Sequence, residues 1–159
     1  MIDIEQVIAE LDTVTEMIWE ATIRSHVTKV DVIPPDRQHG PTVGACVHIL
    51  GGWYGSVSIE CEYSLAQDIV CTMFQIPNQT VASEDWHSVL KELTNVTGGN
   101  IKGLLGDSCI LSTPRAWEGH NFAFEVPDSV ETLCRHYSIL DKFFVVRIHE
   151  SNLDLDGLP

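Results

Sequence analysis

The sequence is poor in basic residues: nine Lys and Arg stand against 23 Asp and Glu, which gives a formal net charge of −14. Nucleic acids and anionic membrane surfaces are bound by clustered Lys and Arg, so this balance disfavours both as partners. No apolar run approaches the roughly 20 residues that span a bilayer. The first residues are acidic and periodic, unlike a signal peptide. We therefore expect that the protein neither binds nucleic acid nor inserts into a membrane.

Cysteine and histidine motifs are also missing. The cysteines form an odd, widely spread set without a CxxC pair: Cys46, Cys61, Cys71, Cys109 and Cys134. This set disfavours a disulfide framework or a zinc knuckle and favours a reducing cytoplasm. The seven histidines show no HxxxH or HExxH spacing. We predict no metal, although a His and Cys site assembled only in the folded chain stays open as an alternative.

The residues that are present suffice for one packed domain. The chain has 159 residues, of which 44% are apolar, enough to bury a sizeable core. We predict a single domain over residues 1–150 and an acidic, flexible tail over 151–159. Acidic side chains gather at the two ends of the chain, and the first 20 residues contain six of them and no basic residue.

Periodicity and turn residues predict helices and strands in an order that does not alternate. Helices are expected over 4–25, 65–75 and 83–105, the last with Ser83 as N-cap. Strands are expected over 27–33, 43–50, 54–62, 109–114, 120–126, 131–139 and 143–149. Gly51-Gly52 and Asp141-Lys142 are the expected hairpin turns. This order predicts an α+β fold, with a mostly antiparallel sheet, a long N-terminal helix and two central helices packed on the sheet.

A narrow polar stripe runs along the helix predicted over 83–105. At 100° per residue, one broad face is apolar and consists of Trp86, Val89, Leu90, Leu93, Val96, Ile101 and Leu104. The opposite ridge presents Ser88, Glu92, Asn95 and Lys102, with Gly99 as a bare spot among them. An ordinary solvent-facing ridge has the same pattern. However, four glycines between 98 and 106 each cost about 1 kcal/mol relative to Ala in a helix interior. They indicate close approach by a partner, close packing on the sheet, or a helix that ends near residue 98.

The same residues carry a family resemblance. The sequence from Ser88 through Glu92 to Asn95, followed by Gly99 and Asn100, resembles the signature of the CheC/CheX/FliY chemotaxis phosphatases: Asp or Ser, three residues, Glu, two residues, Asn. The stretch ELTNVTGGN is most similar to CheX. The upstream stretch GGWYGSVSIECEYSLAQDIVCTMF is similar to a glycine-containing strand and the helix that follows it in this family. The resemblance spans residues 4–149 and implies a CheX-like fold.

Two segments depart from the family pattern. The N-terminal helix has Asp12, Glu16 and Trp19 at the signature spacing, with Trp in place of Asn. This is interpreted either as a lost or never-formed second site or as chance spacing. Pro114 is followed by Arg-Ala-Trp-Glu instead of small and β-branched residues, and the stretch from Asn95 to Pro114 is about one helical turn short. These differences lie at the expected rim of the site, where a partner would dock.

The resemblance implies an enzyme that hydrolyses the phosphoryl-aspartate of a response-regulator receiver domain in chemotaxis or another two-component pathway. Asn95 is the implied water-positioning residue, and Glu92 the implied anchor to the receiver's active-site Lys. Ser88, Gly99 and Lys102 are assigned to the partner-facing surface, where Ser88 and Lys102 also fit a solvated role. Asn100 falls on the apolar side and is predicted to be a buried structural residue that ties the helix to neighbouring backbone.

The implied partners follow from the same resemblance. The receiver supplies Mg²⁺, so no cofactor is expected on this chain, and CheX-like relatives imply a cytoplasmic homodimer. Trp53, Tyr54 and Trp117 are candidate interface residues, but half-buried packing is the more common state of Trp. A non-catalytic adaptor of the same fold, which binds receivers or other signalling proteins, is the alternative function.

Overall fold

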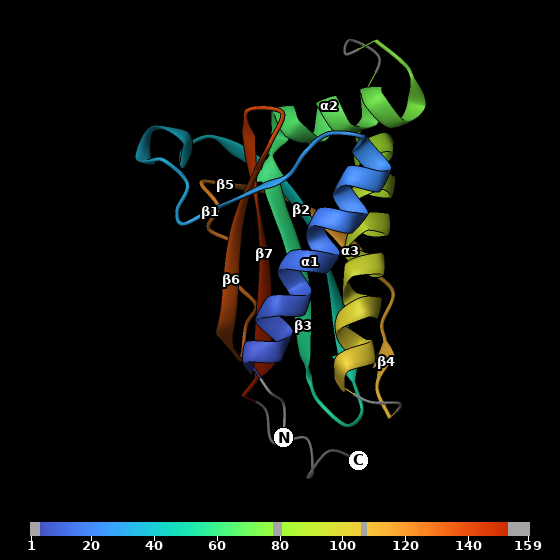
Figure 1. The fold of residues 1–159 in the computed structure, drawn as a ribbon, viewed down its shortest axis with the longest axis vertical. Helices are drawn as coiled ribbons and strands as arrows, with labels where there is room; N and C mark the ends of the chain where they lie inside the picture. The colour runs from blue at the N-terminus through green and yellow to red at the C-terminus, as the bar shows by residue number, and fades with distance from the viewer. Residues whose placement is uncertain (1–3, 78–80, 106–107, 153–159) are drawn as a thin grey trace.

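Helices cover one face of an antiparallel sheet (Figure 1). The computed structural model describes residues 4–77, 81–105 and 108–152. In chain order the elements are α1 (Ile4–Ile23), β1 (Thr28–Val30), the 3-10 helix η1 (Pro35–Arg37), β2 (Pro41–Leu50), β3 (Gly55–Glu62), α2 (Tyr63–Phe74), α3 (Ser83–Leu105), β4 (Ile110–Leu111), β5 (Arg115–His120), β6 (Ser129–Ile139) and β7 (Lys142–Ser151).

The sheet has seven strands in the order β1-β6-β7-β3-β2-β4, and β5 pairs with β2 beside β4. Every pairing is antiparallel. Short β1 lies at one edge, and β4 and β5 lie at the other. The α+β class, the antiparallel sheet, the N-terminal helix and the two central helices are therefore confirmed.

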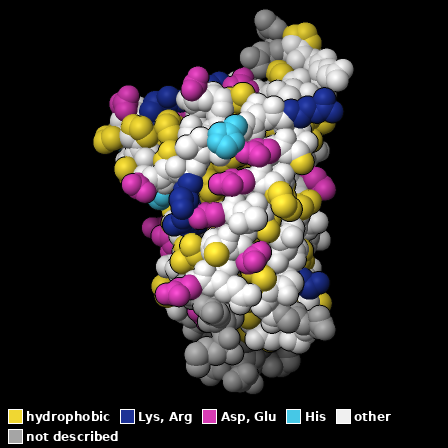
Figure 2. Space-filling model, in the orientation of Figure 1, with side chains coloured by type: hydrophobic (Ala, Val, Ile, Leu, Met, Phe, Trp, Pro, Cys, Tyr) yellow, Lys and Arg dark blue, Asp and Glu magenta, His cyan; other side chains and the backbone are white. Residues whose placement is uncertain are grey.

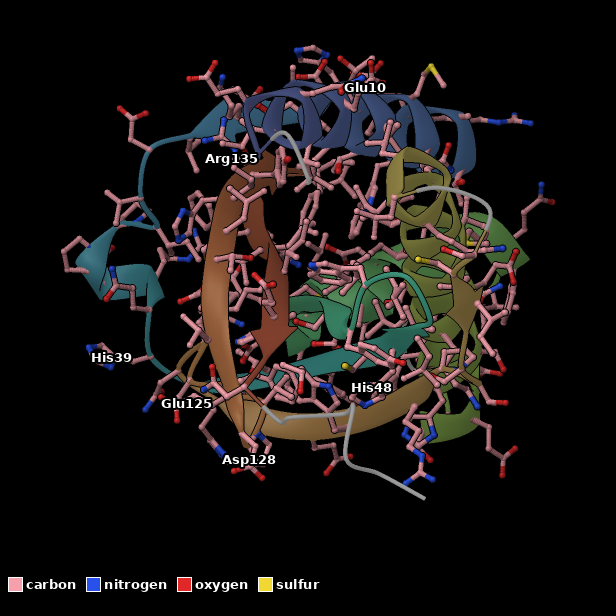
Figure 3. The ribbon with its side chains drawn as sticks, turned by 90° about the horizontal axis from the view of Figure 1, so that it is seen from below. Glu10, His39, His48, Glu125, Asp128 and Arg135 are labelled. Atoms are coloured by element: carbon pink, nitrogen blue, oxygen red, sulfur yellow. The ribbon has the colours of Figure 1, made fainter. Side chains whose placement is uncertain are left out.

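The core lies between the sheet and the helices because strand side chains alternate between the two faces. Trp19 of α1 is fully buried and stacks on Phe144 of β7, with ring centroids 3.7 Å apart. Tyr137 of β6 stacks on the same ring at 5.0 Å. Arg135, labelled in Figure 3, lies beneath α1, while Glu125 and Asp128 lie at the opposite side of the molecule. The aromatic stack therefore fixes α1 on the helical face of the sheet.

The central hairpin agrees closely with the pattern of the sequence. Gly51 follows β2 with a φ of +121°, a conformation that favours glycine. A Cβ at this position would lie 2.1 Å from the Ser108 carbonyl oxygen. The predicted turn at Gly51-Gly52 is confirmed, because both backbone conformation and close approach require glycine at its first position.

Three predicted strands are wrong in their bounds, and one of them, expected over 27–33, shrinks to β1. The strand expected over 120–126 is displaced to β5, because Asn121 and Phe122 both have positive φ values and break the extended chain. The strand expected over 109–114 shrinks to β4. There the Ser112 hydroxyl accepts a hydrogen bond from the His48 backbone N–H at 2.9 Å and takes the place of a ladder bond.

Two predicted boundary residues are displaced by one position. In the β6–β7 hairpin, Ile139 pairs with Lys142, so Leu140 and Asp141 form the turn and both have positive φ. At the start of α3, Ser83 is already helical. The Asp85 carboxylate accepts a hydrogen bond from the backbone N–H of Ala82 at 2.9 Å, half of a capping box.

The predicted tail over 151–159 lies mostly outside the described residues. Ser151 is the last residue of β7, and 153–159 are not among the residues described. None of the described helices is long and apolar enough to cross a membrane.

Candidate functional site

The candidate site lies on α3, which packs closely against β2. Gly98 faces Val47 of β2, where an added Cβ would lie only 2.7 Å from Val47 Cγ1. The predicted apolar face is confirmed, since Trp86, Val89, Leu90, Leu93 and Ile101 are buried and Val96 and Leu104 are half-buried. Gly98 thus belongs to the packing of helix on sheet, one of the explanations that the sequence left open.

The opposite ridge of α3 presents the signature residues to solvent. Ser88 and Glu92 are exposed, and Asn95 is half-buried. Within the described residues, the side chains of Glu92 and Asn95 form no hydrogen bond or ion pair with the rest of the chain. Because a side chain three residues further along a helix lies on the same face, the carboxylate and the amide are both available to one partner.

Gly99 leaves the helix backbone uncovered beside these two residues. A Cβ there would meet only Leu111 Cδ1 of β4, at 3.9 Å, which is an ordinary contact. At Gly103, one turn further on, an added Cβ would meet nothing within 4 Å. Unlike Gly98, neither residue is required by the packing of the described chain, so an open strip of backbone runs along the ridge next to β4.

Asn100 does not lie where the helical wheel predicts. It is exposed, and its side-chain Nδ2 donates to the Val96 carbonyl oxygen of its own helix at 2.9 Å. The expectation of a buried residue tied to neighbouring backbone is wrong. Position 100 lies at the margin of the apolar face, where the side chain reaches water and donates a hydrogen bond to a carbonyl oxygen one turn earlier in α3.

The signature spacing in α1 does not form a second exposed site. The Asp12 carboxylate accepts hydrogen bonds from Arg135 at 3.0 and 2.7 Å and from the Tyr137 hydroxyl at 2.7 Å. Burial alone would raise the pKa of Asp12, but these hydrogen bonds hold it below its ordinary value. Trp19 is fully buried in the core. Two of the three spaced residues thus hold α1 on the sheet, and a half-buried Glu16 remains.

The aromatic residue after Pro114 points away from the site. Trp117 stacks on Phe124 at 4.1 Å, and its six-membered ring lies against Gly44. Trp53 is half-buried, whereas Tyr54 is exposed. Trp117 therefore does not obstruct the ridge of α3, although the sequence placed it near the rim.

A polar hollow on the opposite face of the sheet was not anticipated from the sequence. It has a volume of about 640 Å³ and lies beside residues 122–126, with Arg147 and His149 of β7 among its lining residues. Burial lowers the pKa of His149, which favours a neutral ring. The fully buried Glu60 accepts a hydrogen bond from Arg147 at 2.7 Å. The alternation of polar residues in β3 was visible in the sequence. The residue that pairs with Glu60, Arg147 on β7, lies 87 residues further along the chain, so the pair itself was not.

The described residues offer little support for metal or thiol chemistry. No group of three or more described His, Cys, Asp or Glu side chains is arranged to hold a metal ion. Burial raises the pKa of Cys46 and of Cys134 to about 11, and these thiols stay protonated near neutral pH.

The ridge has the donors and acceptors to orient a water molecule. An amide both donates and accepts hydrogen bonds and does not act as a base near neutral pH. The Asn95 amide can therefore hold a water in place, while the Glu92 carboxylate one turn before it can bind a cationic group. The arrangement fits a reaction in which an external group supplies most of the chemistry.

Comparison with known proteins identifies the family to which the chain belongs. Residues 43–138 match the family model described as chemotaxis phosphatase CheX. No curated protein matches the sequence.

Solved structures of CheX proteins share the fold. The chain is similar to CheX from Vibrio vulnificus, with 17% identity and a TM-score of 0.72 over 89% of this chain and 94% of that one. CheX from Desulfovibrio desulfuricans is 18% identical, with a TM-score of 0.70 over 90% of this chain and 97% of that one. A chain of the CheX–CheY–BeF3–Mg²⁺ complex from Borrelia burgdorferi is 19% identical, with a TM-score of 0.70 over 95% of this chain and 99% of that one. Because the family model covers more than half of the sequence, the chain belongs to the CheX family of chemotaxis phosphatases.

Proposed function

We propose that this protein hydrolyses the phosphoryl-aspartate of a CheY-like receiver domain. The observation that carries the proposal is the pair Glu92 and Asn95 on one ridge of α3. Glu92 is exposed, Asn95 is half-buried, and neither side chain has a partner in the described chain. A CheX–CheY–BeF3–Mg²⁺ complex is known for a protein of the same fold from Borrelia burgdorferi. The geometry and the family therefore support the same reaction.

Asn95 is proposed to position the attacking water. Phosphoryl transfer depends mostly on positioning and on electrostatic stabilisation. A receiver domain with its own Mg²⁺ and Lys supplies the charge that neutralises the phosphoryl oxygens, and an oriented water completes the site. Holding the water in line supplies part of the roughly 7–11 kcal/mol that orientation effects offer.

Glu92 is proposed to anchor the receiver. An exposed carboxylate one helical turn from Asn95 pairs with the receiver's active-site Lys, and a charge-assisted hydrogen bond fixes the register of the two surfaces. Ser88, Gly99 and Lys102 belong to the same partner-facing surface in this proposal. The uncovered backbone at Gly99 gives the receiver room to approach α3. The proposal places the reaction in the cytoplasm.

Glu92→Ala is expected to weaken both binding and turnover, because it removes the anchor that aligns the receiver. We expect KM for a phosphorylated receiver to rise by roughly 10- to 100-fold, in line with one lost charge-assisted bond of about 1.5–3 kcal/mol, and kcat to fall as well. Glu10→Ala is the matched control, since Glu10 is an exposed carboxylate on α1. Equal effects of the two substitutions would contradict the anchor role.

The homodimer remains a prediction. CheX-like relatives imply it, and Tyr54 offers an exposed aromatic side chain, a residue type that is enriched at interfaces. Size-exclusion chromatography with light scattering should give a mass of about twice 17.7 kDa. A mass near that of one chain at micromolar concentration would exclude a stable dimer.

The enzyme is distinguished from a receiver-binding adaptor by two measurements on the same receivers. Binding of each receiver, activated with BeF3⁻ and Mg²⁺, is measured by fluorescence anisotropy. Phosphate release from the phosphorylated form of each receiver is measured in parallel. The proposal predicts that receivers which bind also lose phosphate faster than alone. Binding without faster release from any of them would leave the adaptor function.

A further inference from the structure

Within the described residues, some cationic side chains of this acidic protein pair with a carboxylate and others do not. Five of the nine Lys and Arg form ion pairs: Lys29 and Arg135 with Asp12, Arg37 with Glu62, Lys142 with Asp68, and Arg147 with Glu60. The other four form no ion pair with a described carboxylate, and they are Arg24, Lys91, Lys102 and Arg115. Two of these four lie on α3, the helix that carries Glu92 and Asn95.

Helix geometry places one lysine before Asn95 and one after it along α3. Lys91 precedes Asn95 by four residues, a spacing at which side chains are neighbours on one face. Lys102 follows Asn95 by seven residues, about two turns and about 10 Å along the axis. Both side chains are half-buried, as expected for Lys stems that pack along the helix with their ammonium groups in water. A cationic group therefore stands on each side of the amide along the ridge.

The charge of the expected substrate makes these positions significant. A phosphoryl group carries about −1.5 to −2 charges at neutral pH. The receiver's Mg²⁺ is held by carboxylates, which add negative charge to the same face. The exposed face of α1, by contrast, is acidic, as Figure 2 shows and as exposed Glu5 and Glu10 illustrate. In a protein with a net charge of −14, an anionic substrate is least repelled where unpaired cations lie.

We propose that Lys91 and Lys102 form a cationic flank around Asn95 that attracts and orients the anionic, phosphorylated face of the receiver. The inference rests on the proposed phosphatase function and deepens it. It adds Lys91 to the partner-facing surface and gives Lys102 an electrostatic role. The two lysines act on encounter and binding, whereas Asn95 acts on the water.

The test is the kinetics of Lys91→Gln, Lys102→Gln and the double variant. Gln forms helices about as well as Lys, so the fold is expected to persist. The substrate is the phosphorylated receiver that wild-type protein turns over fastest, in a panel that includes CheY of Borrelia burgdorferi. We expect KM to rise about threefold for each single variant and about tenfold for the double variant at an ionic strength of 0.1 M, with kcat changed less than about twofold.

Salt separates attraction from other contacts. The Debye length falls from about 10 Å at 0.1 M to about 3 Å at 1 M, so the KM values of wild-type and double-variant protein should converge at high salt. Lys29→Gln is the charge-matched control. Lys29 lies on β1, at the opposite edge of the sheet from β4, and its contact with Asp12 is a long one of 3.6 Å. We expect this variant to keep the wild-type KM.

The outcomes distinguish this inference from the function on which it rests. Unchanged KM in the double variant, a lower kcat at unchanged KM, a salt-independent effect, or an equal effect of Lys29→Gln would overturn the cationic flank alone. Wild-type protein that accelerates phosphate release from no receiver would overturn the proposed function and this inference together.

Discussion

Asn95→Ala is expected to reduce phosphate release from a phosphorylated receiver to the receiver's own rate, while the affinity for the receiver stays within about threefold of wild type. The side chain is half-buried on the ridge of α3 and has no partner in the described chain. Its removal therefore breaks no intramolecular contact there, but it removes the group that we assign to the water. Since orientation of a reactant is worth several kcal/mol, the loss of turnover should exceed about 100-fold.

Asn100→Ala provides the matched control for this substitution. Asn100 is an exposed amide on the same helix, five residues further on, and its only described hydrogen bond runs to the Val96 carbonyl oxygen within α3. We expect its activity to equal that of the wild type. If Asn95→Ala retains most of the turnover, or if Asn100→Ala loses as much, Asn95 is not the water-positioning residue.

Glu60→Ala is expected to cause the largest loss of stability. The fully buried Glu60 carboxylate accepts hydrogen bonds from Arg147 at 2.7 Å, from the Thr42 hydroxyl at 2.6 Å and from the backbone N–H of Phe124 at 3.4 Å. Removing one member of a buried ion pair leaves the other charge uncompensated and costs about 3–5 kcal/mol. For a chain of this length, the midpoint of thermal unfolding should fall by roughly 6–20 °C.

Glu131→Ala tests whether this loss arises from burial of the charge. Glu131 contacts the same Arg147 side chain at 3.4 Å, but its side chain is 44% exposed, and exposed ion pairs contribute about 0–1 kcal/mol. Thermal unfolding followed by circular dichroism should show a shift of at most a few degrees for this variant. Similar shifts for the two variants would contradict the role given to the buried pair.

The elements that the sequence predicts well are those with long, regular patterns. The helix predicted over 83–105, with Ser83 as its N-cap, ends where α3 ends and begins within one residue of it, because its apolar residues repeat over six turns. The central hairpin was predictable because β-branched alternation flanks glycine at Gly51, where φ is positive. The α+β class follows from the order of the predicted helices and strands, which do not alternate along the chain.

Positions decided by tertiary contacts were not predictable in this way. Alternating aromatic residues at Phe122 and Phe124 favour a strand. In the structure, however, Phe122 has a positive φ, and its carbonyl oxygen accepts a hydrogen bond from Arg147 of β7 at 2.6 Å, so the segment is not an extended strand. Asn100 illustrates the same limit on a smaller scale. The wheel angle placed it on the apolar side, but exposure at the margin of a face depends on which neighbours cover it.

The candidate ridge was predictable because all its residues lie on one helix, so spacing alone brings Glu92 and Asn95 together. The structure adds what spacing does not contain. It shows that Gly98 is required by packing against Val47, whereas Gly99 is not required by any described contact. It also shows that Asp12 and Trp19 are occupied in holding α1 on the sheet. One of the two signature spacings is thereby left as the candidate site.

The central claim is tested most directly by the number of phosphates released per protein molecule. Catalytic amounts of wild-type protein are mixed with a twentyfold or larger excess of phosphorylated receiver, and inorganic phosphate is followed over time against the receiver alone. The account predicts release faster than the receiver's own rate and many turnovers per molecule. Release at the rate of the receiver alone, for every receiver that binds the protein, would contradict it.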